Sequence, residues 1–376
     1  MRVLHVISDE NIGGAGVLLC TLLRNFDPKR VQSVVALPKG SLLLRRIREL
    51  EIPVRQLKHP SDRLSLSSAG EVGRILKEER IDLVHANAAI SARLAGRMRG
   101  VPVLHTRHCC FPPSGALRFP PLRHAAGMLN RSLSDRVIAT ADAAAENLVS
   151  LGVPKEKISV IINGSDPVRS VPEEELCRLR ERLDLDKGDF TVGICARLEP
   201  CKGHSVFLEG AKLALCRLPQ AKFRFLIAGS GSLEGLLKDE VQRLGIAHAV
   251  RFLGFVSDMA PLWRILRVNV NCSVGTETSC LALSEGMSAS VPCIVSDYGG
   301  NAAMVGESHA GFVIPQDDPE RLADALCRLA TDRELEERMR RAAYRRYTES
   351  YTAVRMSEHL TAVYEALYRH DAVFGG

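Results

Sequence analysis

The feature that most constrains the fold of this chain is a repeated alternation of short apolar runs with longer amphipathic stretches. Runs rich in Val, Ile and Leu occur at residues 2–8, 33–37, 82–85, 102–105, 136–139 and 158–162. Helix-length stretches separate them, for example residues 15–26 and 68–79. Continuous apolar strands that alternate with helices are typical of a parallel sheet covered on both faces. The first half of the chain therefore predicts a doubly wound α/β domain.

The alternation stops at residues 163–175, a turn-rich segment with two prolines, and then begins again. Further apolar runs lie at 190–196, 223–229, 250–256, 268–273 and 292–297. A chain of 376 residues is also too long for one ordinary hydrophobic core. We therefore predict two Rossmann-like parallel-sheet domains, residues 1–168 and 169–349, with a hinge near 165–172.

Composition indicates a soluble, cytoplasmic protein. Hydrophobic residues make up 46% of the chain and charged residues 25%, as in globular proteins. No apolar run approaches the ~20 residues of a transmembrane helix, and the N-terminus has the pattern of a first strand, not of a signal peptide. The eleven cysteines include no C-x-x-C pair and no spacing suited to a metal. We expect buried thiols in a reducing compartment, among them Cys195, Cys216, Cys272, Cys293 and Cys327.

Charge is unevenly distributed along the chain. Residues 1–170 contain 25 Lys and Arg against 15 Asp and Glu, whereas the remainder contains 25 against 29. Such asymmetry fits a first half that faces an anionic membrane surface, a phosphorylated acceptor or nucleic acid, and it equally fits a basic surface without a partner. Aromatic residues make up only 5% and no nucleic-acid-binding signature occurs, so nucleic acid is not expected as a partner.

Two carboxylates, Glu277 and Glu285, stand in a segment with almost no other charge. We expect Glu277 on the loop that opens a helix and Glu285 two turns further along it. The backbone N–H groups of Ser279, Cys280 and Leu281 would then lie at a helix N-terminus, where a phosphate binds. Acids beside an anion site fit a nucleotide sugar, which offers a ribose diol, a diphosphate and sugar hydroxyls. The alternative is a surface helix with two solvated glutamates.

The residues that follow the predicted strands are the other candidates, because ligands of doubly wound domains bind at the carboxyl ends of strands. After the first strand, Gly13 and Gly14 would let a ligand approach the backbone at a helix N-terminus. After the first strand of the second domain, Arg197 and Lys202 share one loop and could clamp a diphosphate. A solvated basic loop is the alternative.

Two later strand ends complete the set. Gly229 and Gly231 form another close-approach turn, and the backbone of Gly254 with the ring of Phe255 could frame a base.

These landmarks, in this order, resemble the retaining glycosyltransferases of family 4, which have the GT-B fold. The resemblance covers essentially the whole chain and is specific for fold and broad reaction, but not for substrates. Its motifs are Gly13-Gly14, His108, Asn163-Gly164-x-Asp166, Arg197, Lys202-Gly203, Gly229-x-Gly231, Gly254-Phe255, Glu277 with Glu285, and Gly299-Gly300.

The resemblance implies transfer of a hexosyl or N-acetylhexosaminyl group from a nucleoside-diphosphate sugar to an acceptor hydroxyl, with retention and without a metal or other cofactor. A UDP sugar is preferred and a GDP sugar is left open. The acceptor would be a glycan, a lipid-linked sugar or a small molecule. A final helix, about 350–369 within the segment 350–376, would cross back to the first domain.

The resemblance also implies roles for individual residues. Arg197 and Lys202 would hold the diphosphate, and Glu285 would accept from the ribose hydroxyls. Glu277, helped by the amides of Ser279, Cys280 and Leu281, would bind the hydroxyls of the donor sugar. Gly13 and Gly14 would let the donor phosphate and the acceptor approach each other, and Gly229 would form a close turn. Gly254 and Phe255 would line the base pocket, and His108 would contact the donor sugar.

Three questions stay open after the resemblance. The residues Thr278-Ser279-Cys280 stand where Gly-Phe-Gly is common, so donor choice is not determined. The basic and apolar segment 107–131 fits either peripheral contact with an anionic membrane or an acceptor-side lid. A nucleotide-sugar epimerase on the same fold and a non-catalytic nucleotide-sugar-binding protein are the alternative functions.

Overall fold

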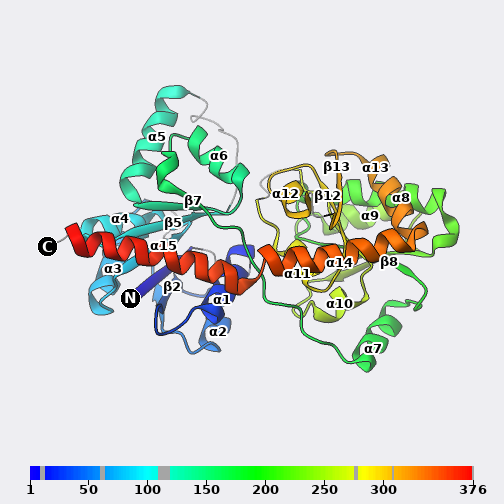
Figure 1. Ribbon diagram of the computed structural model, residues 1–376, viewed down its shortest axis with the longest axis horizontal. Helices are drawn as coiled ribbons and strands as arrows, with labels where there is room; N and C mark the ends of the chain where they lie inside the picture. Colours follow the sequence, from blue (N-terminus) through cyan, green and yellow to red (C-terminus); the bar gives the residue numbers. More distant parts are fainter. Residues whose placement is uncertain (9–12, 60–63, 109–118, 275–277, 307–308, 375–376) are drawn as a thin grey trace. The chain divides into compact units, whose positions relative to one another are not determined.

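The computed structural model describes residues 1–8, 13–59, 64–108, 119–274, 278–306 and 309–374, drawn as a ribbon in Figure 1. The chain divides into two compact units, Met1–Ser165 with Ala353–Gly376, and Asp166–Thr352. Each unit contains one sheet, and the strand pairings of both sheets, over the described residues, are all parallel. The predicted fold of two doubly wound parallel-sheet domains is confirmed.

Unit 1 is built on a seven-stranded sheet of order β3-β2-β1-β4-β5-β6-β7. Its strands are β1 (Arg2–Ile7), β2 (Gln32–Pro38), β3 (Val54–Leu57), β4 (Leu83–Asn87), β5 (Val103–Arg107), β6 (Arg136–Ala139) and β7 (Ile158–Val160). Its α-helices are α1 (Gly14–Asn25), α2 (Leu43–Arg48), α3 (Leu66–Glu78), α4 (Ile90–Arg99), α5 (Pro120–Leu133), α6 (Asp142–Ser150) and α15 (Ala353–Phe374).

The two faces of this sheet are covered by different helices. On β1, Leu4 and Val6 join a core with α3 and α4, whereas Ile7 joins a core with α1 and α2. This division follows from the two-residue period of a strand. Helix α15, drawn in red and orange in Figure 1, packs beside α1, and its Tyr364 is fully buried.

Unit 2 is built on a six-stranded sheet of order β10-β9-β8-β11-β12-β13. Its strands are β8 (Phe190–Cys195), β9 (Phe223–Ala228), β10 (Val250–Gly254), β11 (Val268–Asn271), β12 (Cys293–Ser296) and β13 (Gly311–Ile314). Its α-helices are α7 (Glu173–Leu183), α8 (His204–Arg217), α9 (Glu234–Leu244), α10 (Ala260–Ile265), α11 (Leu281–Ser288), α12 (Asn301–Val305), α13 (Pro319–Thr331) and α14 (Arg333–Ser350).

Helices also cover both faces of the second sheet. One core contains Phe190, Phe207 and Leu326, which come from β8, α8 and α13. The other contains Leu226, Trp263 and Leu179, from β9, α10 and α7. Short 3₁₀ turns in the described residues lie at Pro200–Lys202 and Pro219–Ala221 in unit 2 and at Lys155–Lys157 in unit 1.

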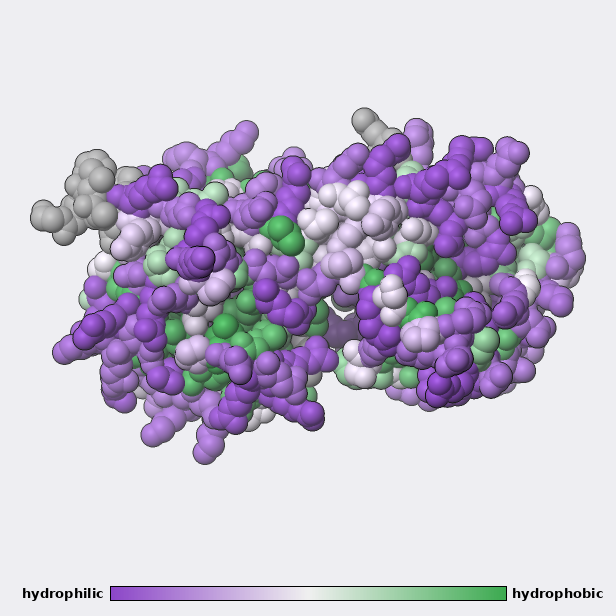
Figure 2. Space-filling view, turned by 60° about the horizontal axis from the view of Figure 1, so that its bottom comes forward, coloured by the Kyte–Doolittle hydropathy of each residue, from purple (hydrophilic) through white to green (hydrophobic). Residues whose placement is uncertain are grey.

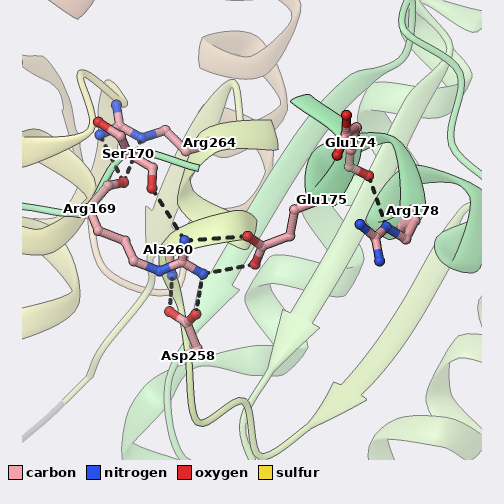
Figure 3. Close-up of polar contacts among 8 residues, drawn as sticks. All are labelled: Arg169, Ser170, Glu174, Glu175, Arg178, Asp258, Ala260 and Arg264. Atoms are coloured by element: carbon pink, nitrogen blue, oxygen red, sulfur yellow. Dashed lines mark hydrogen bonds and ion pairs between the residues drawn. The ribbon is translucent and has the colours of Figure 1, made fainter. Parts of the chain in front are cut away.

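Polar contacts tie the chain to unit 2 directly after the boundary at residue 166 (Figure 3). The Arg169 guanidinium lies between the carboxylates of Glu175, at 2.8 Å, and Asp258, at 2.6 Å. Arg264 Nη2 donates to Val168 O at 2.8 Å. The segment that leads into α7 is therefore fastened to α10.

Figure 2 shows one face on which hydrophilic side chains surround smaller hydrophobic patches. Among the exposed large apolar side chains are four on or beside α5, namely Phe119, Leu122, Met128 and Leu129. In the described residues, no helix is both long enough and apolar enough to span a bilayer.

The structure corrects one expectation and adds two strands. The expectation of buried thiols holds for Cys272 and Cys293, but Cys216 is exposed and Cys195 and Cys327 are half-buried. An apolar neighbourhood in sequence does not decide which face of a helix a residue occupies. The strands β3 and β13 were also not anticipated. Both are edge strands of their sheets and are incompletely buried, and β3 includes Arg55 and Gln56.

Candidate functional site

The strand order of unit 2 places a switch point between β8 and β11. From β8 the chain passes to β9 and β10 on one side of the sheet, and to β11, β12 and β13 on the other. The loops that leave β8 and β11 therefore diverge and open a crevice at their carboxyl ends, where ligands of such sheets bind.

The loop after β8 carries the two predicted cations. Arg197 is exposed, and the half-buried Lys202 ends a 3₁₀ turn. Backbone bonds fix the loop on both sides, since Leu198 N donates to Ser230 O at 3.0 Å and Val274 N donates to Cys201 O at 2.9 Å. The loop after β8 is thereby joined to the loops after β9 and β11.

Glycines at this edge permit close backbone packing. Gly203, directly after Lys202, has φ +66°, and a Cβ there would lie 2.0 Å from Cys272 O. Gly229 has φ +147°, and a Cβ there would lie 1.9 Å from Ala196 O. Neither position can accept a side chain without movement of the backbone. The glycines therefore set the position of the cationic loop against its neighbours.

The base-pocket candidates lie at the end of β10. Gly229 N donates to Gly254 O at 2.8 Å, so the two strand ends are adjacent. Gly254 has φ +64°, and the Phe255 ring that follows is 60% exposed.

Helix α11 begins on the β11 side of the crevice. Its N-cap is Cys280, whose side chain makes no capping hydrogen bond to the first turn. Asn269 Nδ2 donates to Ala282 O at 2.9 Å, which fixes the first turn to β11. The helix begins at Leu281, so Ser279 precedes it and is buried. Glu277 lies outside the described residues.

Glu285 stands in the second turn of α11 in an unusual environment. Trp263 Nε1 donates to Glu285 Oε2 at 3.2 Å. Burial raises the pKa of the Glu285 carboxyl to about 7, and the negative charge of Asp166 adds to the increase, whereas the bond from Trp263 opposes it. A carboxyl with this pKa changes its charge near neutral pH.

A small cavity of about 10 Å³ joins these parts. Its walls come from the ends of β8 and β11, the cationic loop and the first turn of α11, and include Cys195, Lys202, Asn271, Cys280 and Leu283. That volume corresponds to about one water molecule. The cavity thus lies where a lysine and a helix N-terminus converge, an arrangement suited to an anionic oxygen.

Unit 1 contains the other predicted residues. Gly13 is the N-cap of α1 in an extended conformation with φ −95°, and Gly14 is the first helical residue with open space around its Cβ position. His108 follows β5, and its Nε2 lies 2.9 Å from Asn87 Oδ1. Burial lowers the pKa of His108 to about 4. Its ring is therefore neutral at physiological pH.

The sequence interpretation missed several residues around these sites. Trp263 gave a signal as the only tryptophan in the chain, but its bond to Glu285 requires α10 and α11 to be neighbours. Cys195 and Asn269 lie within strands and gave no motif. Asn87, which pairs with His108, ends a strand and could have been listed by the same rule as the other strand ends.

Two parallel-sheet units, each with a switch point in its strand order, place the chain in the class of doubly wound α/β proteins. The comparisons name the family. The family model "Glycosyl transferases group 1" matches residues 178–346, and "Glycosyltransferase Family 4" matches residues 12–169. The chain therefore belongs to the family 4 glycosyltransferases, has the GT-B fold and is a glycosyltransferase of EC class 2.4.

Relatives and solved structures agree with this assignment. The chain is 30% identical to the UDP-Gal:alpha-D-GlcNAc-diphosphoundecaprenol alpha-1,3-galactosyltransferase of Escherichia coli, over 70% of each protein. It is 28% identical to the D-inositol 3-phosphate glycosyltransferase of Streptomyces avermitilis, over 70% of this chain and 61% of that protein.

Among solved structures, Anabaena Alr3699/HepE in complex with UDP matches with a TM-score of 0.83 and 21% identity, over 97% of this chain and 100% of that one. At this identity the match supports the fold alone.

Proposed function

We propose that this protein transfers a hexosyl or N-acetylhexosaminyl group from a UDP sugar to an acceptor hydroxyl, with retention and without a metal. The observation that carries the proposal is the crevice between β8 and β11, where Lys202 and the first turn of α11 line one cavity. A lysine and a helix N-terminus together favour a diphosphate. The E. coli relative is named for a UDP-Gal donor, which supports uridine as the base.

In this mechanism the acceptor oxygen attacks the anomeric carbon from the face that the diphosphate leaves. One C–O bond forms to the acceptor while the C–O bond to the phosphate breaks, and the acceptor proton passes to the departing phosphate oxygen. Arg197 and Lys202 are proposed to stabilise the negative charge that develops there. No protein base is needed for that proton transfer.

The remaining roles are proposed from the same resemblance. Glu285 accepts from the ribose hydroxyls, and Glu277 with the amides near Cys280 binds the donor sugar. The Glu285 carboxyl has a pKa of about 7. It is therefore ionised, and accepts hydrogen bonds from the ribose hydroxyls most strongly, above neutral pH. UDP affinity should therefore increase as pH rises through about 7.

The acceptor side is proposed to include a lipid-linked sugar and contact with anionic membrane through α5. The E. coli relative is named for a diphosphoundecaprenol-linked acceptor. Exposed apolar side chains at Phe119, Leu122 and Met128 on or beside α5 support this contact. Sedimentation with vesicles that contain an anionic lipid tests it.

The first experiment is a thermal-shift panel of UDP, GDP, ADP and NAD in the presence of EDTA. A ligand at ~100 times its Kd adds roughly 2.7 kcal/mol to stability. Stabilisation by UDP alone, lost in Arg197→Ala, is the expected result. UDP release from UDP-galactose and UDP-glucose then tests turnover, and the anomeric signal of the product by NMR tests retention. No response to any diphosphate would refute the proposed site.

A further inference from the structure

Asn87 lies at the switch point of unit 1. It is the last residue of β4, and its register partners are Ile7 on β1 and Thr106 on β5. The sheet order changes direction between β1 and β4, since β1 is followed in space by β2 and β3 on its other side. The carboxyl ends of these two strands therefore open the crevice in which a doubly wound domain binds its ligand.

The side-chain amide of Asn87 makes a hydrogen bond through its oxygen but not, within the described residues, through its nitrogen. The residue is 6% exposed, and its Oδ1 lies 2.9 Å from His108 Nε2. Its Nδ2 is buried and has no hydrogen-bond partner among the residues that the structure describes. An unsatisfied buried donor costs about 1–3 kcal/mol, and buried polar groups in native proteins are nearly always paired. A buried donor at a ligand-binding crevice is explained if the ligand supplies the acceptor.

The bond to His108 also determines the chemistry of the imidazole. Asn87 Oδ1 can only accept, so His108 Nε2 must carry the proton of that bond. In a neutral ring, the lone pair then resides on Nδ1. Burial favours the neutral ring, because it lowers the pKa of His108 to about 4. The pair thus presents uncharged groups, which suit a hydroxyl better than a phosphate or a carboxylate.

We propose that Asn87 both positions His108 and binds substrate: its Oδ1 holds His108 in the Nε2-protonated tautomer, and its Nδ2 donates to a hydroxyl oxygen of a sugar substrate. This inference rests on the proposed glycosyl transfer. The hydroxyl can belong to the donor sugar or to the acceptor, and the rate measurements below separate the two.

The test compares Asn87→Ala, which removes both amide atoms, with Asn87→Asp, which keeps an acceptor for His108 but removes the donor. Asn25→Asp is the control, because Asn25 is a half-buried asparagine of unit 1 at the end of α1, whose Nδ2 donates to Thr21 O at 2.8 Å. The tautomer of His108 is read from ¹⁵N NMR of histidine-labelled full-length protein, with His108→Gln for assignment. Circular dichroism confirms folding of each variant.

Three results are expected. Wild-type His108 is in the Nε2–H tautomer, and Asn87→Ala loses this preference. Asn87→Asp raises the pKa of His108 by roughly 2 units, because a carboxylate then faces the ring. Both variants lower the rate of UDP release about tenfold to a hundredfold, whereas UDP affinity measured by calorimetry is unchanged.

The rates locate the hydroxyl. They are measured with UDP-galactose or UDP-glucose, first with water alone and then with a synthetic GlcNAc-diphospho-lipid. A loss in both assays assigns the bond to the donor sugar, and a loss only with the lipid assigns it to the acceptor.

Two outcomes would overturn the inference: an Nδ1–H tautomer in the wild type, or wild-type rates in Asn87→Ala. Wild-type protein that neither binds UDP nor releases it would refute the proposed function instead, and the NMR measurement would still test the Asn87–His108 pair. If Asn87→Ala does not fold, Asn87→Asp carries the test.

Discussion

Acidification to pH 5 is expected to destabilise unit 1 far more than unit 2, because unit 1 buries neutral histidines. Burial lowers the pKa of His5 and of His105 to about 3, and that of His108 to about 4. Burial lowers the pKa of His85 as well, and its ring nitrogens are hydrogen-bonded to the hydroxyl groups of Tyr364 and Thr106 at 2.6 Å each. In unit 2, over the described residues, only His204 has a resolved shift of this kind, to about 4.

The sign follows from proton linkage. An unfolded histidine titrates near 6.5, so the contribution of a buried neutral histidine is present above that pH and is lost as pH falls toward its folded pKa. At pH 5 the pH lies about 1.5 below the pKa of an unfolded histidine, so protonation of each such residue favours the unfolded state by roughly 2 kcal/mol. Three such residues amount to about 6 kcal/mol, which is a large part of a typical stability of 5–15 kcal/mol.

The assay uses the single tryptophan. Trp263 is buried in unit 2, so its fluorescence reports that unit, whereas circular dichroism reports both. During thermal unfolding at pH 5, ellipticity should fall before the Trp263 signal changes, and at pH 7.5 the gap should narrow. His5→Phe keeps a ring stacked near Phe26 and removes the titrating group. It should reduce the loss of Tm in unit 1 between the two pH values by ~4–8 °C.

His359→Gln, at an exposed position of α15, is the matched control and should behave as wild type. Simultaneous loss of both signals at pH 5, or an unchanged loss of Tm in His5→Phe, would refute the reasoning.

Three further predictions concern the site and its surroundings. Glu285→Gln should stabilise the nucleotide-free protein by roughly 3 kcal/mol at pH 8, because the raised pKa of the Glu285 carboxyl makes the folded state lose stability as pH rises from 4.5 toward about 7. The variant should also bind UDP about tenfold more weakly, and equal Tm values of the two proteins at pH 8 would contradict this prediction. Gly203→Ala should abolish UDP binding and lower Tm, because the added Cβ would lie 2.0 Å from Cys272 O. Gly14→Ala is the control and should fold normally, because there is open space at its Cβ position. Wild-type UDP binding by Gly203→Ala would show that the loop tolerates the methyl group. Replacement of Leu122 and Met128 by Ser should lower sedimentation with anionic vesicles without a change in Tm, and unchanged sedimentation would exclude α5 as the membrane contact.

Much of the fold was readable from the sequence, for a local reason. Apolar runs such as 190–196 and 268–273 are buried on both faces of a parallel sheet, so they stand out without knowledge of their neighbours. The motif order and the loop glycines likewise indicated the family, because the positive φ angles of Gly203 and Gly229 are a property of the local backbone.

The candidate site was only partly readable. Arg197, Lys202 and Glu285 could be named in advance, since each follows a strand or belongs to a motif. Their joint placement depends on the strand order, which puts β8 next to β11 although about seventy residues separate them in the chain. No local pattern encodes that adjacency.

The sequence by itself determined the two-domain parallel-sheet fold, the family and the charged residues of the cationic loop, because periodicity and turn chemistry act over short stretches of chain. The tertiary structure decided which side chains lose water and meet. It placed Trp263 beside Glu285, whose carboxyl has a pKa of about 7. It also placed Asn87 beside His108 and left the Asn87 Nδ2 donor unpaired within the described part of the chain. Burial and hydrogen bonding between distant segments set the electrostatics of a site, and only the folded chain brings those segments together.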